Sequence, residues 1–97
     1  MELIKDVQGS EIAIKVIGRL NTATTPELSD ALDDLDGVTK VSLDLEELDY
    51  LSSSALRVML SVHKKMAKQG ELVLYNVSDD VMEIFEMTGF ADLLNFG

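Results

Sequence analysis

The sequence contains no cysteine and no tryptophan, and it has only one histidine and one proline. The lack of cysteine excludes a disulfide scaffold and thiol-based chemistry, and one histidine cannot build a histidine-rich metal site. A run of about 18 apolar residues, the minimum for a membrane span, does not occur. The first residues, "MELIKDVQGS", lack the basic and apolar segments of a signal peptide. We therefore expect a non-secreted, cytoplasmic protein.

Basic residues are also scarce, because 8 Lys and Arg stand against 18 Asp and Glu, for a net charge of −10. Such a surface repels phosphate backbones and anionic lipids, so we expect neither nucleic acid nor membrane as a partner. The acidic residues concentrate in "ALDDLDG" and "DLEELD". We interpret these segments as a solvated face, with a docking surface for a basic protein as the alternative.

The apolar pattern predicts four strands within one domain, residues 1–97, because no linker, repeat or change of composition divides the chain. Apolar and polar residues alternate over 2–7 and 11–17, which predicts a hairpin around Gly9 with Ile12, Ile14 and Val16 on the core side. Further strands are expected over residues 40–45 and 71–77.

Three amphipathic helices are predicted between and after these strands. The first begins with Thr25 as cap and Pro26 in the first turn and stops at Gly37. The second follows the serines of "YLSSSALRVML" and ends before Gly70, and its expected buried stripe is Leu56, Met59, Leu60, Val62 and Met66. The third has Ser78 as its N-cap, and "FADLLNF" closes the domain as a short turn or helix.

The resulting order, β-β-α-β-α-β-α, predicts an α/β domain with a four-stranded mixed sheet and helices packed mainly on one face. The loops that leave the carboxyl ends of parallel strands gather at one edge, where functional sites tend to lie. These loops span residues 18–25, 46–53 and 76–78, so the serine cluster belongs to the middle one.

The sequence offers little for catalysis. His63 lies about 13 Å along the second helix from Ser54, too far to activate that hydroxyl directly. No phosphate-binding glycine motif, calcium loop or HExxH pattern is present. We expect no enzymatic activity, no cofactor and no metal.

The three serines have two interpretations. Serine is a preferred N-cap, which accounts for one of them. Phosphorylation is the alternative, because a phosphate would meet free N–H groups and a favourable dipole at the start of its own helix. Such a phosphate would leave the fold intact and would act on a partner.

The segment "KVSLDLEELDYLSSSALRVMLSVHKKMAKQGELVLYNV", with "GRLNTATTPELSDAL" before it and "FEMTGFADLLNF" after it, resembles the STAS domain of bacterial anti-sigma-factor antagonists. The resemblance implies a protein that binds an anti-sigma factor with ATP-dependent serine kinase activity and so releases a sigma factor. It further implies that phosphorylation switches binding off and that a serine phosphatase restores it.

The family's phosphoacceptor, the second serine of a D-S-S/T-G-L-G pattern, corresponds to Ser54, with Ser53 as the second choice. Ser52 replaces the aspartate of that pattern, and Ala55 and Arg57 replace its two glycines. The resemblance and the loop positions together give the expected partner-binding residues: Asn21, Thr22, Thr24, Tyr50, Ser52, Ser53, Ala55, Arg57 and Ser61, with Lys64 on the same helix face.

Two interpretations of function remain open. The first is the phosphorylation-switched antagonist, expected to be a monomer or a weak dimer. The second is a non-switching STAS interaction or scaffold module in another signalling assembly, in which Ser54 only caps a helix.

Overall fold

Five strands and three α-helices make up the computed structural model, which describes all residues, 1–97. The strands are β1 (Glu2–Gln8), β2 (Glu11–Leu20), β3 (Lys40–Asp44), β4 (Leu48–Leu51) and β5 (Glu71–Tyr75). The helices are α1 (Thr25–Ala31), α2 (Ser53–Met66) and α3 (Asp79–Met87), followed by a short 3-10 helix, η1 (Phe90–Asp92). The predicted order of elements is confirmed, with one strand added.

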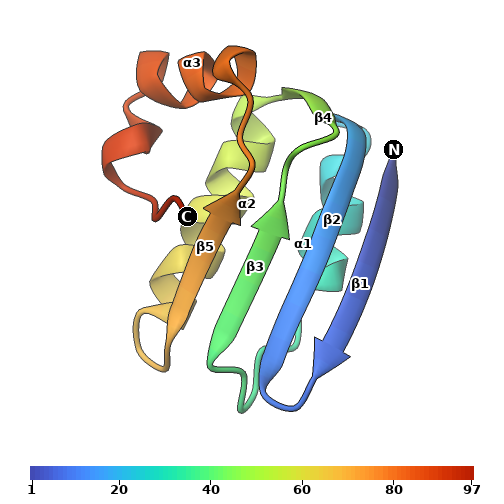
Figure 1. Cartoon of the computed structure of the whole chain (residues 1–97), viewed down its shortest axis with the longest axis vertical. Coiled ribbons are helices and arrows are strands. Elements are labelled where there is room, and N and C mark those ends of the chain that lie inside the picture. Colours follow the sequence, from blue (N-terminus) through green and yellow to red (C-terminus); the bar gives the residue numbers. More distant parts are fainter.

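The sheet has the strand order β1-β2-β3-β5, and β4 pairs with the last residues of β2 (Figure 1). The first two strands form the predicted antiparallel hairpin, and Gly9 supplies the left-handed backbone, with φ +61°, that its turn requires. All other pairs are parallel. The mixed sheet places the carboxyl ends of β2, β3 and β5 along one edge.

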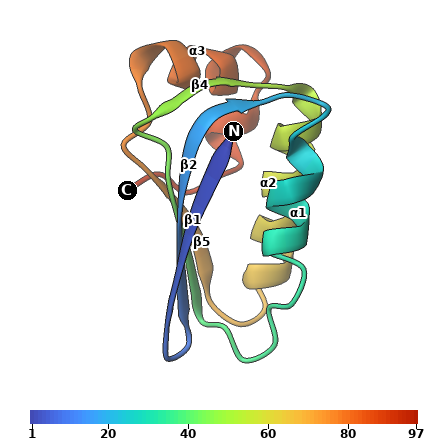
Figure 2. The same cartoon turned by 90° about the vertical axis from the view of Figure 1, so that its right-hand side faces the viewer.

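Helices α1 and α2 cover one face of the sheet, and the other face is open (Figure 2). Helix α3 lies across the carboxyl edge of the strands, next to β4 (Figures 1 and 2). The predicted one-sided packing is therefore confirmed. None of the helices combines the length and the apolar character needed to cross a membrane.

The core lies between the sheet and α1 and α2. Ile12, Ile14 and Val16 are all buried, as the alternation in β2 predicts. Of the expected stripe on α2, Leu60 is only half-buried and the other four side chains are buried. Each fully buried side chain of this size stabilises the fold by about 1.5–3 kcal/mol.

The expectation of four strands is wrong, because β4 lies within the segment that we predicted to be a loop. This strand has only four residues, and Asp49 and Tyr50 in its middle are exposed while Leu48 and Leu51 are buried. A pattern this short and this acidic is hard to distinguish from a loop in the sequence.

The predicted boundaries of α1 are also wrong. Thr24 is the N-cap, and Thr25 is a buried helical residue whose hydroxyl donates to the backbone oxygen of Asn21 at 2.7 Å. The helix ends at Ala31, well before Gly37, because the acidic residues after it are poor helix formers. Apolar side chains beyond the helix end are still buried, namely Leu32 and Leu35.

Candidate functional site

The serine cluster lies at the carboxyl edge of the sheet, where the sequence predicts it. The backbone N–H of Ser52 donates to the oxygen of Leu20 at 2.8 Å, which ties the start of α2 to the end of β2. Because β4 pairs with this end of β2, the serines and the loop between β2 and α1 leave the sheet side by side. The added strand therefore positions the site.

The three serines have different environments. The hydroxyl of Ser52 caps α2 by accepting the N–H of Ala55 at 3.4 Å, and it also lies 2.8 Å from the hydroxyl of Ser54. Ser53 is exposed, whereas Ser54 is half-buried. Only one serine is thus required as the cap. The first turn of α2 contains no carboxylate, so no side-chain charge offsets the positive end of its dipole.

Ser54 faces a groove between the start of α2 and α1. The groove has a volume of about 280 Å³ and is lined by Thr22, Thr25, Pro26, Ser29, Asp30, Ser54 and Val58. A phosphate on Ser54 would enter a space that Asp30 already supplies with negative charge. A negative charge added at Ser54 would therefore meet a like charge in the same groove.

The loop between β2 and α1 is held by its own side chains. The Asn21 carboxamide oxygen accepts the N–H groups of Ala23 and Thr24, each at 3.0 Å. The hydroxyl of Thr24 accepts from the N–H of Asn21 and donates to the oxygen of Arg19 at 2.7 Å. Asn21 and Thr24 therefore brace the loop from within, while Thr22 remains exposed.

Tyr50 is exposed beside the serine cluster, and Arg19 lies against it. The Arg19 guanidinium carbon is 4.7 Å from the centre of the Tyr50 ring, which is the geometry of a cation–π contact. Tyrosine and arginine are the residue types that most often dominate protein interfaces. Arg19 was not predicted as a site residue, because the pairing of β2 with β4 alone brings it to Tyr50.

The outer face of α2 carries three of the expected contact residues. Arg57, Ser61 and Lys64 are exposed. The expectation that Ala55 contacts a partner is wrong, because its side chain is 0% exposed and points into the core. The helix turns Ala55 inward, next to Leu56, which is also buried.

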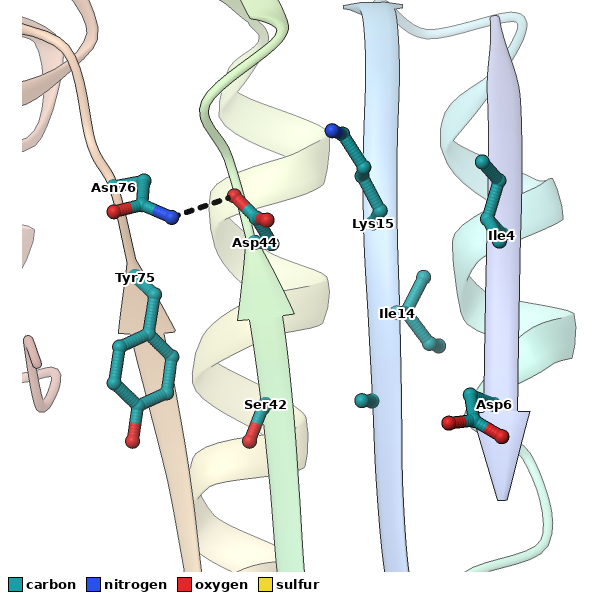
Figure 3. Close-up of a pocket in the computed structure, with 9 residues that line it drawn as sticks. Ile4, Asp6, Ile14, Lys15, Ser42, Asp44, Tyr75 and Asn76 are labelled. Carbon is teal, nitrogen blue, oxygen red and sulfur yellow. Dashed lines mark hydrogen bonds between the residues drawn. The ribbon is translucent and has the colours of Figure 1, made fainter. Parts of the chain in front are cut away.

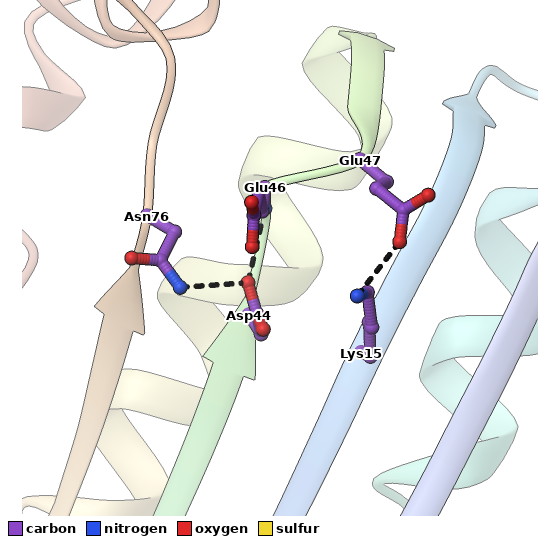
Figure 4. A network of polar contacts seen from close by, with 5 residues as sticks. All are labelled: Lys15, Asp44, Glu46, Glu47 and Asn76. Carbon is purple, nitrogen blue, oxygen red and sulfur yellow. Dashed lines mark hydrogen bonds and ion pairs between the residues drawn. The ribbon is translucent and has the colours of Figure 1, made fainter.

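A polar network fixes the loop that leads from β3 to β4 (Figure 4). One oxygen of Asp44 accepts both the side-chain N–H of Asn76, at 3.1 Å, and the backbone N–H of Glu46, at 3.0 Å. Lys15 pairs with Glu47 at 2.7 Å. The hydrogen bond to Glu47 and the charge of that carboxylate raise the pKa of Lys15 above its ordinary value. These contacts connect the carboxyl ends of β3 and β5, and the middle of β2, to the loop between β3 and β4.

The largest hollow of the structure lies elsewhere, on the open face of the sheet (Figure 3). It has a volume of about 460 Å³ and is lined by Ile4, Asp6, Ala13, Ile14, Lys15, Ser42, Asp44, Tyr75 and Asn76. At the amino end of β3, the Tyr75 hydroxyl raises the pKa of Lys40. The helices lie on the opposite face, so this hollow is separate from the serine cluster.

The serine cluster consists of hydroxyls without a neighbouring base. His63 is further along α2, nine positions after Ser54. No group of three or more His, Asp or Glu side chains lies close enough together to hold a metal ion. The geometry is suited to contact with another protein and to acceptance of a group that another protein transfers.

Comparison with known proteins gives one family. The model of the STAS domain matches residues 2–97. An anti-sigma-B factor antagonist of Listeria monocytogenes is 33% identical over 95 residues, which cover 94% of this chain and 82% of that protein.

Solved structures have the same fold. The anti-sigma factor antagonist SpoIIAA in its unphosphorylated form has a TM-score of 0.83 at 19% identity, with 99% of this chain and 88% of that chain covered. The phosphorylated form of SpoIIAA, a cell fate determinant of Bacillus, has a TM-score of 0.76 at 18% identity, covering 99% and 91% of the two chains.

Proposed function

Because the chain belongs to the STAS domain family, we propose that it is an anti-sigma-factor antagonist. In this proposal it binds an anti-sigma factor that is also an ATP-dependent serine kinase, and binding releases a sigma factor. Phosphorylation of Ser54 switches binding off, and a serine phosphatase restores it. The family resemblance inferred from the sequence is confirmed by the match to the STAS domain model.

The observation that carries this proposal is the start of α2. It presents two hydroxyls that the cap does not require, in a first turn without carboxylates, at the exposed edge of the sheet. A phosphate brings a charge of about −1.5 to −2. At a helix N-terminus this charge meets unpaired N–H groups and the positive end of the dipole. The modified helix therefore stays folded.

The effect of the phosphate falls on the partner. Ser54, in the first turn of α2, lines the groove toward α1, and Thr22 of the neighbouring loop lines the same groove. A partner that covers both elements would bury the phosphate beside Asp30, and an unpaired buried charge is strongly unfavourable. The same position is occupied by a small neutral hydroxyl before modification. Phosphorylation of Ser54 thus converts a surface that is complementary to the partner into one that disfavours binding.

The relatives support this proposal. The Listeria protein is named as an anti-sigma-B factor antagonist, and the structurally similar SpoIIAA is known in both phosphorylated and unphosphorylated forms. In this chain, Ser54 is the proposed acceptor because its hydroxyl faces the groove. Ser53 is the second choice, because it is exposed on the outer side of the helix.

The test is mass spectrometry of the intact protein and its peptides after incubation with ATP and the purified anti-sigma kinases of its own cell. We expect one added phosphate, which is lost in Ser54→Ala and retained in Ser53→Ala. The matched control is Ser78→Ala, which removes the equivalent cap hydroxyl of α3 and should leave phosphorylation unchanged.

Three other results would correct the proposal. Loss of the phosphate only in Ser53→Ala would move the acceptor by one residue. A kinase that binds the protein without modifying it would favour the non-switching scaffold. Absence of both binding and phosphate with every anti-sigma factor of the cell would exclude the antagonist function.

A further inference from the structure

Helix α2 carries charge of one sign only. Its residues Ser53–Met66 include Arg57, Lys64 and Lys65 but no Asp or Glu, although the whole chain has a net charge of −10. Arg57, Ser61 and Lys64 are spaced by four and three positions, which places them on one line of the helix surface. Lys68, four positions further, continues this line in the turn after the helix. We call these four exposed residues the α2 stripe.

The cations of the α2 stripe have no ionic partner within the molecule. The chain contains one ion pair, between Lys15 and Glu47, on a different element. The helix dipole accounts for Lys64, which lies in the last turn. It does not account for Arg57, which is the fifth residue of the helix and lies far from its C-terminal end. The fold therefore gives no internal reason for the stripe.

The stripe is compact, and α1, the helix packed against α2, is acidic. At about 1.5 Å per residue, Arg57 and Lys64 are separated by roughly 10 Å along the axis. Helix α1 contains Glu27 and Asp30, and α3 contains four carboxylates and no basic residue. A long nucleic acid or a flat anionic membrane would meet these acidic elements as well as the stripe. A folded protein with a small acidic patch would meet the stripe alone.

We propose that the α2 stripe is a docking surface for a carboxylate-rich face of a partner protein. The stripe is continuous with the serine cluster, since Arg57 lies three positions after Ser54 on the same helix. This inference rests on the proposed function, because it specifies the chemistry of the face that the partner anti-sigma factor presents. A phosphate on Ser54 would also attract the Arg57 side chain, and Arg57 would then no longer be free to bind the partner's carboxylates.

The first test does not require the natural partner. The isotopically labelled chain is titrated at low salt, followed by amide NMR, with a glutamate-rich peptide, a lysine-rich peptide of equal length, a DNA duplex and phosphatidylserine vesicles. We expect shifts in the amides of residues 57–68 with the glutamate-rich peptide only. No shift in this segment, or shifts there with DNA or vesicles, would overturn the proposal. Shifts that depend on protein concentration alone would instead assign the stripe to self-association.

Matched charge reversals sharpen this test. Lys64→Glu and Lys40→Glu change the net charge equally, but Lys40 lies on the opposite, open face of the sheet and contacts Tyr75. Lys64→Glu should abolish the peptide-induced shifts, and Lys40→Glu should retain them. If both variants change the peptide-induced amide shifts equally, net charge explains those shifts and the stripe is not a docking site.

The second test uses the purified anti-sigma factor. Reversal of a charge in an electrostatic interface lowers affinity mainly through the association rate. We expect Lys64→Glu to bind about tenfold more weakly at low salt and Lys40→Glu to bind within about twofold of the wild type. Equal binding of the wild type and Lys64→Glu would exclude the stripe from this interface. If the wild type does not bind, the proposed function fails, while the peptide titration still decides on the stripe.

Discussion

Helices α2 and α3 begin in the same way and then differ. Each has a serine N-cap whose hydroxyl accepts the N–H three positions later: Ser52 from Ala55 at 3.4 Å, and Ser78 from Val81 at 3.3 Å. In α3 the next two residues are Asp79 and Asp80. In α2 the same two positions are serines.

This difference in first-turn charge bears on the proposed role of the serine cluster. The carboxylates of α3 already match the positive end of its dipole, so its start is complete as a structural cap. The start of α2 has the same serine cap, but its first turn contains no carboxylate. Because α3 tolerates two negative charges there, a phosphate on α2 is compatible with a folded helix. The proposed switch would therefore act at an interface and not on the fold.

The largest expected effect is a loss of partner affinity when a charge is added at Ser54. Ser54→Asp should weaken binding to the purified anti-sigma factor by about 100-fold, or roughly 2.8 kcal/mol, because it buries a charge in the interface. Asp80→Ser, the reverse change at the equivalent position of α3, should leave binding within about twofold. Calorimetric titration measures the affinity for the anti-sigma factor, and thermal unfolding measures the stability of each variant. Unchanged binding of Ser54→Asp would favour the non-switching scaffold.

A second comparison tests whether the two caps are equivalent. Ser52→Ala and Ser78→Ala each remove the oxygen that satisfies a first-turn N–H, which should lower the free energy of unfolding by about 1 kcal/mol. Urea denaturation measures both. Ser53→Ala is the control, because its hydroxyl makes no hydrogen bond in the fold and its change should stay within about 0.5 kcal/mol. A neutral Ser52→Ala would show that α2 does not use this cap.

The smallest expected effect is a change in stability when the charges in the first turns of α2 and α3 are exchanged. Ser53→Asp should stabilise α2 and Asp79→Ser should destabilise α3, each by about 0.3–1 kcal/mol, because a carboxylate interacts favourably with the N-terminal end of the dipole. Both changes should shrink in high salt. Urea denaturation at two salt concentrations checks this. Effects of the same sign would mean that local contacts outweigh the dipole.

Much of the fold could be predicted from local patterns. The alternation around Gly9, the apolar stripe of α2 and the cap at Ser78 are short-range signals, and the structure confirms them. The end of α1 was missed because Leu35 continues a helical spacing although it packs into the core from outside the helix. The spacing of apolar residues alone does not distinguish a buried residue within a helix from one that packs into the core beyond the helix end.

The candidate site was predicted in part. The sequence placed Ser52 and Ser54 at the right edge of the sheet, because parallel strands and a helix start determine that position. Arg19 was missed because its contact with Tyr50 depends on β4, a strand formed by pairing between distant segments. The inward position of Ala55 was open to prediction, because Ala55 lies four and seven positions before Met59 and Val62 of the predicted buried stripe.

The internal hydrogen bonds of the loop that begins at Asn21 have a kinetic consequence. The bonds between Asn21 and Thr24, and from Ser52 to β2, fix the binding surface before any partner arrives. Little conformational entropy then remains to be lost on association. A rigid surface of this kind binds at rates of about 10⁵–10⁷ M⁻¹s⁻¹ without a folding step. Under the proposed function, the response time would therefore be set by the kinase and the phosphatase, and not by slow ordering of this domain.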